Sequence, residues 1–399
     1  MKFVVTLLCA GAAYGAVLPA GTELSIRLLD KIASEAPAAS PVTVRAAVIA
    51  PVVVDGRIVL PAGPQLTGAV KDASAASGAT RAQLRLDFTE ISMGSLRAKV
   101  SAIVSGLENA RETVDDKGMI LGIDASQSYG GRLDEGIAKL QGSDRFAGLA
   151  SLIMGAKEAL KIQDVDANID YDPGAEMTLK LTAPLDWRGP SSGPEARLQP
   201  FPDQDALVRL VDGQPFRTVA VQPPRPSDMT NIMLIGTEEE LRAAFDKAGW
   251  VEAARLDMQS KIATARALIE DRGYKEGPMS VLLLDGQPPA FALQKGNNTF
   301  SQRHHMRVFR RPGTFAGKPV WVCSSTHDIG IDFSDRDHTF IHKVDSSIDR
   351  ERSKIVNDLL FTGMVKSLAL VDRPNVPQSI SNATGDTLKT DGRMAVLMF

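Results

Sequence analysis

The sequence predicts an α+β protein with two folded domains: an N-terminal β-barrel-like domain with a helical insertion, and a C-terminal α/β domain with a mixed sheet. Three observations predict this class. Short segments of alternating apolar and polar residues recur through the first half of the 399-residue chain. Apolar residues at helical spacing interrupt this half at about 132–161. The second half alternates strand-like and helix-like segments, and a stretch rich in Pro and Gly separates the two halves.

Residues 1–15 have the pattern of a secretory signal peptide. Lys2 precedes an apolar run over Phe3–Ala10, and Ala13-Tyr14-Gly15 places small residues at the two positions that signal peptidase reads. We expect cleavage before Ala16 and a mature protein in the periplasm or outside the cell. The alternative is an uncleaved membrane anchor, which the glycines of this segment disfavour, because a spanning helix needs about 20 strongly apolar residues.

The composition is that of a packed globular protein without a strongly charged surface. Hydrophobic residues make up 44%, charged residues 23%, and the formal net charge is −3. A charge this small does not indicate nucleic acid or an anionic membrane as the partner. The sequence has no phosphate-binding loop, dinucleotide fingerprint or His-Glu-x-x-His motif, which disfavours nucleotide hydrolysis and hydride transfer.

A turn containing Pro and Gly recurs three times, each time before a strand-like segment. The copies are Pro19–Leu24, Pro61–Leu66 and Asp172–Met177. Because such turns launch strands, we expect a β-rich, barrel-like domain over residues 16–187. Residues 17–92 resemble the β-barrel domain of the TrbI-like outer-membrane channel component of conjugation machines, which carries a similar turn. That family's membrane-crossing helices are not visible here, so the resemblance implies a barrel and not a channel.

The helical insertion is predicted by leucine and isoleucine residues that recur every three or four positions. They are Leu133, Ile137, Leu140, Leu149, Leu152, Ile153 and Leu160. We expect one or two helices that pack against the barrel. The alternative is a mobile lid or a helix pair that binds a partner.

Residues 188–228 are rich in Pro and Gly and predict an interdomain linker, interrupted by a short strand around Leu207–Val211. The C-terminal domain then covers residues 229–399. It opens with a buried strand at Asn231–Gly236 and a capping box at Thr237–Glu240. The other elements that we expect are a helix at about 253–271, strands at 279–285, 289–294, 303–310, 319–326 and 338–344, a helix over about 346–364, and a closing strand at Arg393–Phe399.

Several ordered blocks of this half resemble the LssY C-terminal family over about residues 228–370. The blocks are Asn231–Gly236, a helix ending at Ala248-Gly249-Trp250, Arg303–Arg307, Trp321-Val322, Asp328-x-Gly330, and His342-x-Val344-Asp345 followed by Asp349-x-Glu351-Arg352. The resemblance implies a fold and a cell-envelope setting, because this domain often lies beside membrane modules such as type 2 phosphatidic acid phosphatases. It implies no reaction, and the chain lacks the Pro-Ser-Gly-His signature of those phosphatases.

All five histidines lie within residues 304–342, with carboxylates between them. Imidazole and carboxylate groups bind Zn²⁺ and act as acids and bases near neutral pH. Strand geometry limits the combinations. His304 and His305 would point to opposite faces of one strand. His338 and His342 would share a face, but would stand about 13 Å apart, too far to bind one ion.

The sequence therefore indicates one candidate site, whose cofactor or metal is left open. The candidate catalytic residues are His305, His342 and Asp328, with His327 as an alternative to Asp328. The candidate ligand-binding residues are His304, Arg307, Asp345, Asp349 and Arg352. The alternative roles are structural: histidines bonded across a sheet, Asp345 capping the next helix, and Arg352 tied to Asp349. After signal cleavage Cys323 is the one remaining cysteine, and an inert buried thiol is preferred over a Cys–His pair.

We expect an exported bacterial cell-envelope protein that acts as a binding or assembly module. Its partners would be envelope proteins or membrane-associated components, not nucleic acid. One alternative is a His/Asp-dependent phosphoester hydrolase, with or without a metal ion. Another is a structural component of the envelope.

Overall fold

The structure of the chain is a computed structural model that describes residues 4–5, 16–35, 42–54, 57–78, 80–142, 146–190, 198–221, 224–253, 266, 269–270, 279–296, 302–334 and 339–399. Of residues 4–5, 16, 57, 147, 331–334 and 339–342 it describes the backbone only. Among the described residues, no helix combines the length and the apolar character needed to span a membrane.

The N-terminal domain is an antiparallel barrel of six strands. They are β3 (Glu23–Leu28), β5 (Thr43–Val48), β8 (Gln65–Ser74), β9 (Gln83–Met93), β10 (Leu96–Leu107) and β14 (Glu176–Leu181). They pair in the order β10-β14-β3-β5-β8-β9, and a further pairing of β9 with β10 closes the barrel. Alternate side chains of these strands, such as Leu24 and Ile26, fill one core with Phe88 and Trp187. The predicted barrel is confirmed.

Short strands extend the barrel domain. β11 (Thr113–Val114) and β12 (Met119–Leu121) continue the sheet beyond β9. Three small antiparallel pairs lie apart from it: β2 (Ala16–Leu18) with β15 (Leu185–Trp187), β4 (Ile32–Ala33) with β13 (Asp170–Tyr171), and β6 (Val52–Val54) with β7 (Arg57–Leu60).

The three repeated turns are equivalent in the structure. Gly21, Gly63 and Gly174 have φ angles of +89°, +113° and +102°, a region that favours glycine. Each of these glycines donates its N–H to a carbonyl of the neighbouring barrel strand: to Leu181 at 2.7 Å, Val48 at 2.8 Å and Leu28 at 2.8 Å, respectively. The repeat therefore marks the places where β3, β8 and β14 enter the barrel.

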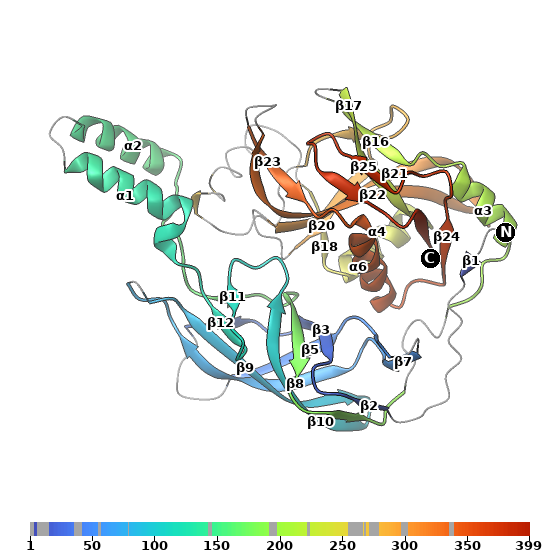
Figure 1. Cartoon of the computed structure of the whole chain (residues 1–399), viewed down its shortest axis with the longest axis horizontal. Coiled ribbons are helices and arrows are strands. Elements are labelled where there is room, and N and C mark those ends of the chain that lie inside the picture. The colour runs from blue at the N-terminus through green and yellow to red at the C-terminus, as the bar shows by residue number, and fades with distance from the viewer. Residues whose placement is uncertain are drawn as a thin grey trace.

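The insertion forms two helices, α1 (Tyr129–Gln141) and α2 (Ala147–Ala159), after a 3₁₀ turn at Ala125–Gln127. Ser128 caps α1 by accepting the N–H of Gly131. The expected helices are confirmed, but the prediction that they pack against the barrel is wrong. They pack against each other and project beyond both domains (Figure 1). The apolar residues of α2 are spread around its circumference, so α2 buries only part of them against α1.

The C-terminal domain is built on an 11-stranded mixed sheet. Its main path is β1 (Val4–Val5), β24 (Ser367–Asp372), β27 (Arg393–Met398), β17 (Pro224–Ile235), β22 (Lys318–Ser334), β21 (Gln302–Phe315), β20 (Phe291–Lys295) and β18 (Trp250–Glu252). β16 (Arg217–Val221), β19 (Leu282–Leu283) and β23 (Thr339–Val344) join at its side, and β25 (Ser379–Ser381) pairs with β26 (Thr387–Lys389). β17 and β27 are parallel and the other pairs are antiparallel, which confirms the mixed sheet.

Helices cover both faces of this sheet. α4 (Glu238–Lys247) and α6 (Ile348–Phe361) pack on the face turned towards the barrel (Figure 1), through buried residues such as Phe245 and Leu359. The predicted capping box is confirmed, because Thr237 and Glu240 exchange both hydrogen bonds at the start of α4. The predicted 253–271 helix lies mostly outside the described residues.

The predicted strand at Leu207–Val211 is wrong. This segment belongs to α3 (Gln204–Asp212), which packs on the other face of the sheet. Asp203 caps the helix by accepting the N–H of Ala206. Leu207 and Val211, one turn apart, are both buried against the sheet.

Candidate functional site

Two clusters of buried and half-buried polar side chains join the two domains. The first, the ion cluster, consists of Arg27, Glu176, Lys295, Lys354 and Asp358. Arg27 and Glu176 come from barrel strands β3 and β14, and the other three come from β20 and α6. Glu176 contacts Lys354 at 2.6 Å, Arg27 at 2.7 Å and Lys295 at 2.9 Å. Asp358 contacts the same three cations at 2.9, 3.1 and 3.0 Å. Each carboxylate therefore binds cations from both sides of the domain boundary.

The surroundings keep this cluster ionised. Burial by itself would raise the pKa of Glu176, but Lys354, Lys295 and Arg27 outweigh it and hold that pKa well below its ordinary value. The pKa of Asp358 is lowered in the same way. The indole N–H of Trp250 donates to Asp358 at 3.0 Å. Because a buried charge without its partner is costly, the cluster fixes the barrel against the sheet.

The second, the histidine cluster, consists of Glu108, Asn109, His304, His327 and Glu351. His304 lies between two carboxylates: its Nδ1 is 2.7 Å from Glu351 on α6, and its Nε2 is 2.8 Å from Glu108 of the barrel domain. His304 and His327 are cross-strand neighbours on β21 and β22, and their rings stack with centroids 4.1 Å apart. Burial lowers the pKa of His304, but Glu351 and Glu108 outweigh it and raise that pKa to about 9. His304 is therefore a cation at neutral pH that joins the domains.

Glu108 and Asn109 follow directly after β10. The backbone N–H of Glu108 donates to the carbonyl of Glu176 at 3.0 Å, which links the two clusters. Asn109 has a φ of +51°, in the left-handed region that Asn tolerates better than most residues. Its Oδ1 lies 3.0 Å from Nε2 of His327. Burial and the neighbouring His304 lower the pKa of His327.

His305 lies on the opposite face of β21, as its strand parity predicted. Its Nε2 is 2.9 Å from Asp328, which also pairs with Arg303 at 3.2 Å. All three side chains are buried. The hydroxyl of Thr326 lies 3.3 and 3.4 Å from the two ring nitrogens of His305, so it is directed at neither. The structure thus brings His305 and Asp328 together but places them apart from His304.

Three further predicted residues, Asp345, Asp349 and Arg352, make contacts within the C-terminal domain. Asp345 accepts the N–H of Ser347 before α6, and Arg352 pairs with Asp349 at 3.1 Å and with Asp391 at 2.8 Å. These contacts fit the structural roles offered as alternatives, in which Asp345 caps the next helix and Arg352 is tied to Asp349.

Arg307 donates to the carbonyl of Ser280 and lies 3.6 Å from Asp228. The side chain of His342 lies outside the described residues, and its backbone pairs with Ile331 in the β22–β23 hairpin.

Comparison with known proteins identifies the C-terminal domain. Residues 220–394 match the profile of the family described as "LssY C-terminus". The chain carries an LssY C-terminal domain. Among curated proteins no match was found. The chain also has a distant structural match to ComB10 of the Com type IV secretion system of Helicobacter pylori, a TrbI/VirB10-like protein. The match has 11% sequence identity, covers 44% of this chain and 92% of that chain, and has a TM-score of 0.24.

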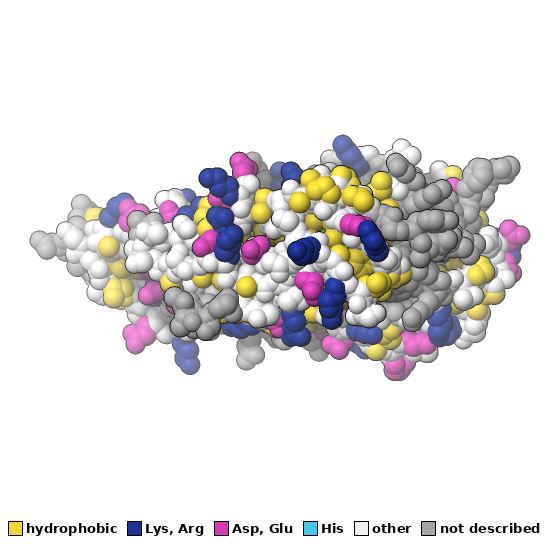
Figure 2. Space-filling view, turned by 90° about the horizontal axis from the view of Figure 1, so that it is seen from below, with side chains coloured by type: hydrophobic (Ala, Val, Ile, Leu, Met, Phe, Trp, Pro, Cys, Tyr) yellow, Lys and Arg dark blue, Asp and Glu magenta, His cyan; other side chains and the backbone are white. Residues whose placement is uncertain are grey.

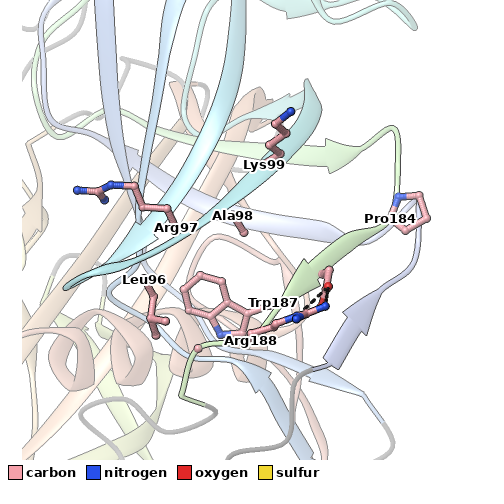
Figure 3. A pocket seen from close by; sticks show the side chains of 9 residues that line it. Leu96, Arg97, Ala98, Lys99, Pro184, Trp187 and Arg188 are labelled. Carbon is pink, nitrogen blue, oxygen red and sulfur yellow. Dashed lines mark hydrogen bonds and ion pairs between the residues drawn. The ribbon is translucent and has the colours of Figure 1, made fainter.

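Two adjoining hollows lie on the barrel domain rather than on the LssY domain. Their volumes are about 390 and 670 Å³. Arg97, Ala98, Lys99 and Pro184 line both of them, and the smaller one also meets Trp187 (Figure 3). No histidine lines either hollow. On the face seen in Figure 2, basic and acidic side chains are interspersed with apolar ones, without a patch of one charge sign.

Cys323 lies within the core of the LssY domain. The residue is fully buried between the sheet and its helices, and burial strongly raises the pKa of its thiol. A neutral, inaccessible thiol is a poor nucleophile, which supports the inert role over a Cys–His pair.

Sequence reasoning found His304 and His327 but missed their partners in the barrel domain. Glu108 and Asn109 are 196 and 218 residues away from the histidines that they contact. Neither belongs to a motif. The nitrogens of His304 and His327 and a carboxylate oxygen of Glu108 all lie within 4.8 Å of one another, so these three residues have the spacing of a metal site.

Proposed function

We propose that this chain is an exported cell-envelope protein that acts as a binding or assembly module, with the LssY domain holding the barrel and its helical projection in a fixed arrangement. The observation that carries the proposal is what the polar side chains of the candidate site contact. His304 joins two carboxylates across the domain boundary, and neither hollow of the barrel domain is lined by a histidine. This arrangement supports a role in holding the two domains together more than a role in converting a substrate.

The projecting α1–α2 hairpin supports a binding role. Its large apolar side chains are exposed to solvent; they include Tyr129, Phe146, Leu149, Leu152 and Met154. Large exposed apolar side chains gathered on one projecting element are typical of a part that contacts a partner or a membrane. The hairpin is therefore the part of the chain that we expect to contact an envelope partner.

The alternative is a hydrolase centred on His305 and Asp328, and their 2.9 Å contact favours it over other catalytic groupings. In a nucleophilic relay the carboxylate orients one imidazole nitrogen and the other nitrogen acts on the nucleophile. Here the Thr326 hydroxyl lies 3.3 and 3.4 Å from the two ring nitrogens of His305 and is directed at neither, and both His305 and Asp328 are buried. The module is therefore the stronger proposal.

Three measurements on the chain expressed in a bacterial host test the proposal. Mass spectrometry of the recovered protein is expected to find an N-terminus at Ala16. A photo-crosslinking residue at Leu152, which is 71% exposed on α2, is expected to give a defined adduct. The matched control at Val53, which is 55% exposed on β6 in the barrel domain, is expected to give none.

The third measurement is hydrolysis of a general phosphoester such as p-nitrophenyl phosphate. A chain that keeps residues 1–15, or that gives equal adducts from both positions, contradicts the module. Turnover that disappears in His305→Ala overturns it in favour of the hydrolase.

A further inference from the structure

We propose that Glu108, His304 and His327 form a binding site for a divalent transition-metal ion, best matched to Zn²⁺, at the boundary between the barrel and the LssY domain. The site takes one ligand from the barrel domain and two from the LssY domain. It goes beyond the proposed function, because a binding module needs no metal.

The spacing of the donor atoms is close to that of a zinc site. Oε1 of Glu108 lies 2.8 Å from Nε2 of His304 and 3.8 Å from Nε2 of His327. Metal–ligand distances of about 2.0–2.2 Å place the ligand atoms of a tetrahedral zinc ion about 3.3 Å apart. The rings of His304 and His327 stack nearly parallel, with an interplanar angle of 19°, so one ring has to turn before both nitrogens face one ion. With that turn, side-chain shifts on the order of 1 Å bring all three atoms onto one ion.

The groups behind the ligands suit a metal site. Glu351 holds Nδ1 of His304 at 2.7 Å, which presents Nε2 of the same ring to the site. A carboxylate in this position fixes the tautomer of a zinc-bound histidine and raises its basicity. The other oxygen of Glu351 is buried and has no hydrogen-bond partner among the described residues. An unsatisfied carboxylate oxygen at this depth is unusual, and a cation bound nearby would stabilise it.

The site is open on one side. The side chains of Glu108 and His327 are 37% and 19% exposed, whereas that of His304 is 4% exposed and lies behind them. An ion can therefore reach the outer two ligands from solvent. Two imidazoles and one carboxylate leave the fourth position of a tetrahedral ion free for water or another ligand.

Binding exchanges a proton for the ion. In the metal-free chain the contact between His304 and Glu108 holds a proton on Nε2 of the imidazolium. On binding, that N–H bond breaks, the proton leaves to solvent, and the nitrogen lone pair forms the bond to the metal. The neutral ring of His327 moves its Nε2 proton, which faces Oδ1 of Asn109, to Nδ1 through solvent, and its Nε2 lone pair then binds the metal. The carboxylate of Glu108 then binds the metal in place of the proton.

The test uses the purified full chain, produced without a polyhistidine tag and treated with a chelator that is then removed. Zn²⁺ binding is measured by calorimetric titration, and Co²⁺ is used as a spectroscopic probe of four-coordinate geometry. We expect one ion per chain. His327→Ala and Glu108→Gln are expected to remove this binding, and Glu351→Gln to weaken it by about 10–100-fold. Circular dichroism checks that each variant is folded.

His305→Ala is the matched control, because His305 lies on the same strand as His304 with its side chain on the opposite face. We expect the His305→Ala variant to bind the ion as the unchanged chain does. An absence of stoichiometric binding in the unchanged chain overturns the proposal. So does binding that is equal in His327→Ala and His305→Ala. Either result leaves the crosslinking and N-terminal tests of the module untouched, so the two proposals fail separately.

Discussion

Replacing Glu176 with glutamine tests the ion cluster, because it removes a negative charge and keeps the side-chain volume. In the unchanged chain Glu176 contacts Arg27, Lys295 and Lys354 at 2.6 to 2.9 Å. In the variant these three buried cations share the one carboxylate of Asp358. Breaking a buried ion pair by removing one partner costs about 3–5 kcal/mol. The folding equilibrium is therefore expected to shift by a factor of at least about 100.

Urea unfolding followed by tryptophan fluorescence measures this loss, since Trp187 lies in the barrel core and Trp250 and Trp321 lie in the core of the LssY domain. The matched control is Glu135→Gln on α1, whose pair with Lys139 is exposed. Such a surface pair contributes about 0.3–0.5 kcal/mol. A Glu176→Gln variant that is no less stable than this control would refute the reasoning.

The difference in stability between the unchanged chain and the Glu176→Gln variant is expected to depend on pH. Because the folded-state pKa of Glu176 is depressed, its stabilising effect is present above its ordinary pKa and is lost as pH falls through the depressed value. The difference in unfolding free energy between the unchanged chain and Glu176→Gln is therefore expected to be full at neutral pH and to shrink on acidification. A difference that grows as pH falls contradicts the assigned sign.

Three further predictions concern other parts of the fold. The pKa of His304 is raised from 6.5 to about 9. Its contribution, about 3 kcal/mol, is therefore full below pH 6.5 and lost as pH rises through about 9. In chelator-treated protein, unfolding titrations of His304→Gln and the unchanged chain are expected to converge at alkaline pH, and a gap that widens there is the contrary result. Gly68→Ala is expected to cost about 1–3 kcal/mol, because its Cβ would overlap the backbone oxygen of Asp87. Gly136→Ala on α1, where nothing lies within 4 Å, is expected to stabilise by about 0.5–1 kcal/mol, and thermal unfolding compares the two. Iodoacetamide is expected to modify Cys323 only after denaturation, and peptide mass spectrometry of the native protein would reveal early modification.

Features that depend on nearby residues could be predicted from the sequence. The turns at Gly21, Gly63 and Gly174 were visible because Pro and Gly restrict or permit particular backbone angles. Strand parity alone placed His304 and His305 on opposite faces of β21, and the structure agrees. The capping box of α4 was likewise fixed by two residues three positions apart.

Features that depend on distant residues could not be predicted. Arg27 and Asp358 are 331 positions apart, and no local pattern connects them. Glu108 is an ordinary surface-type residue until the barrel places it beside His304. The strand predicted at Leu207–Val211 is wrong for another reason. A short apolar run fits either a strand or a helix, and the cap at Asp203 favours the helix.

The docking of the two domains is tested most directly by a double-mutant cycle between Glu176 on β14 and Lys354 on α6, whose side chains are 2.6 Å apart. The unfolding free energies of Glu176→Gln, Lys354→Met and the double variant give the coupling between them. Joined domains predict a coupling of about 1–3 kcal/mol, as for residues in one buried network. Free-energy losses that add within about 0.5 kcal/mol would contradict a direct contact between the barrel and the LssY domain.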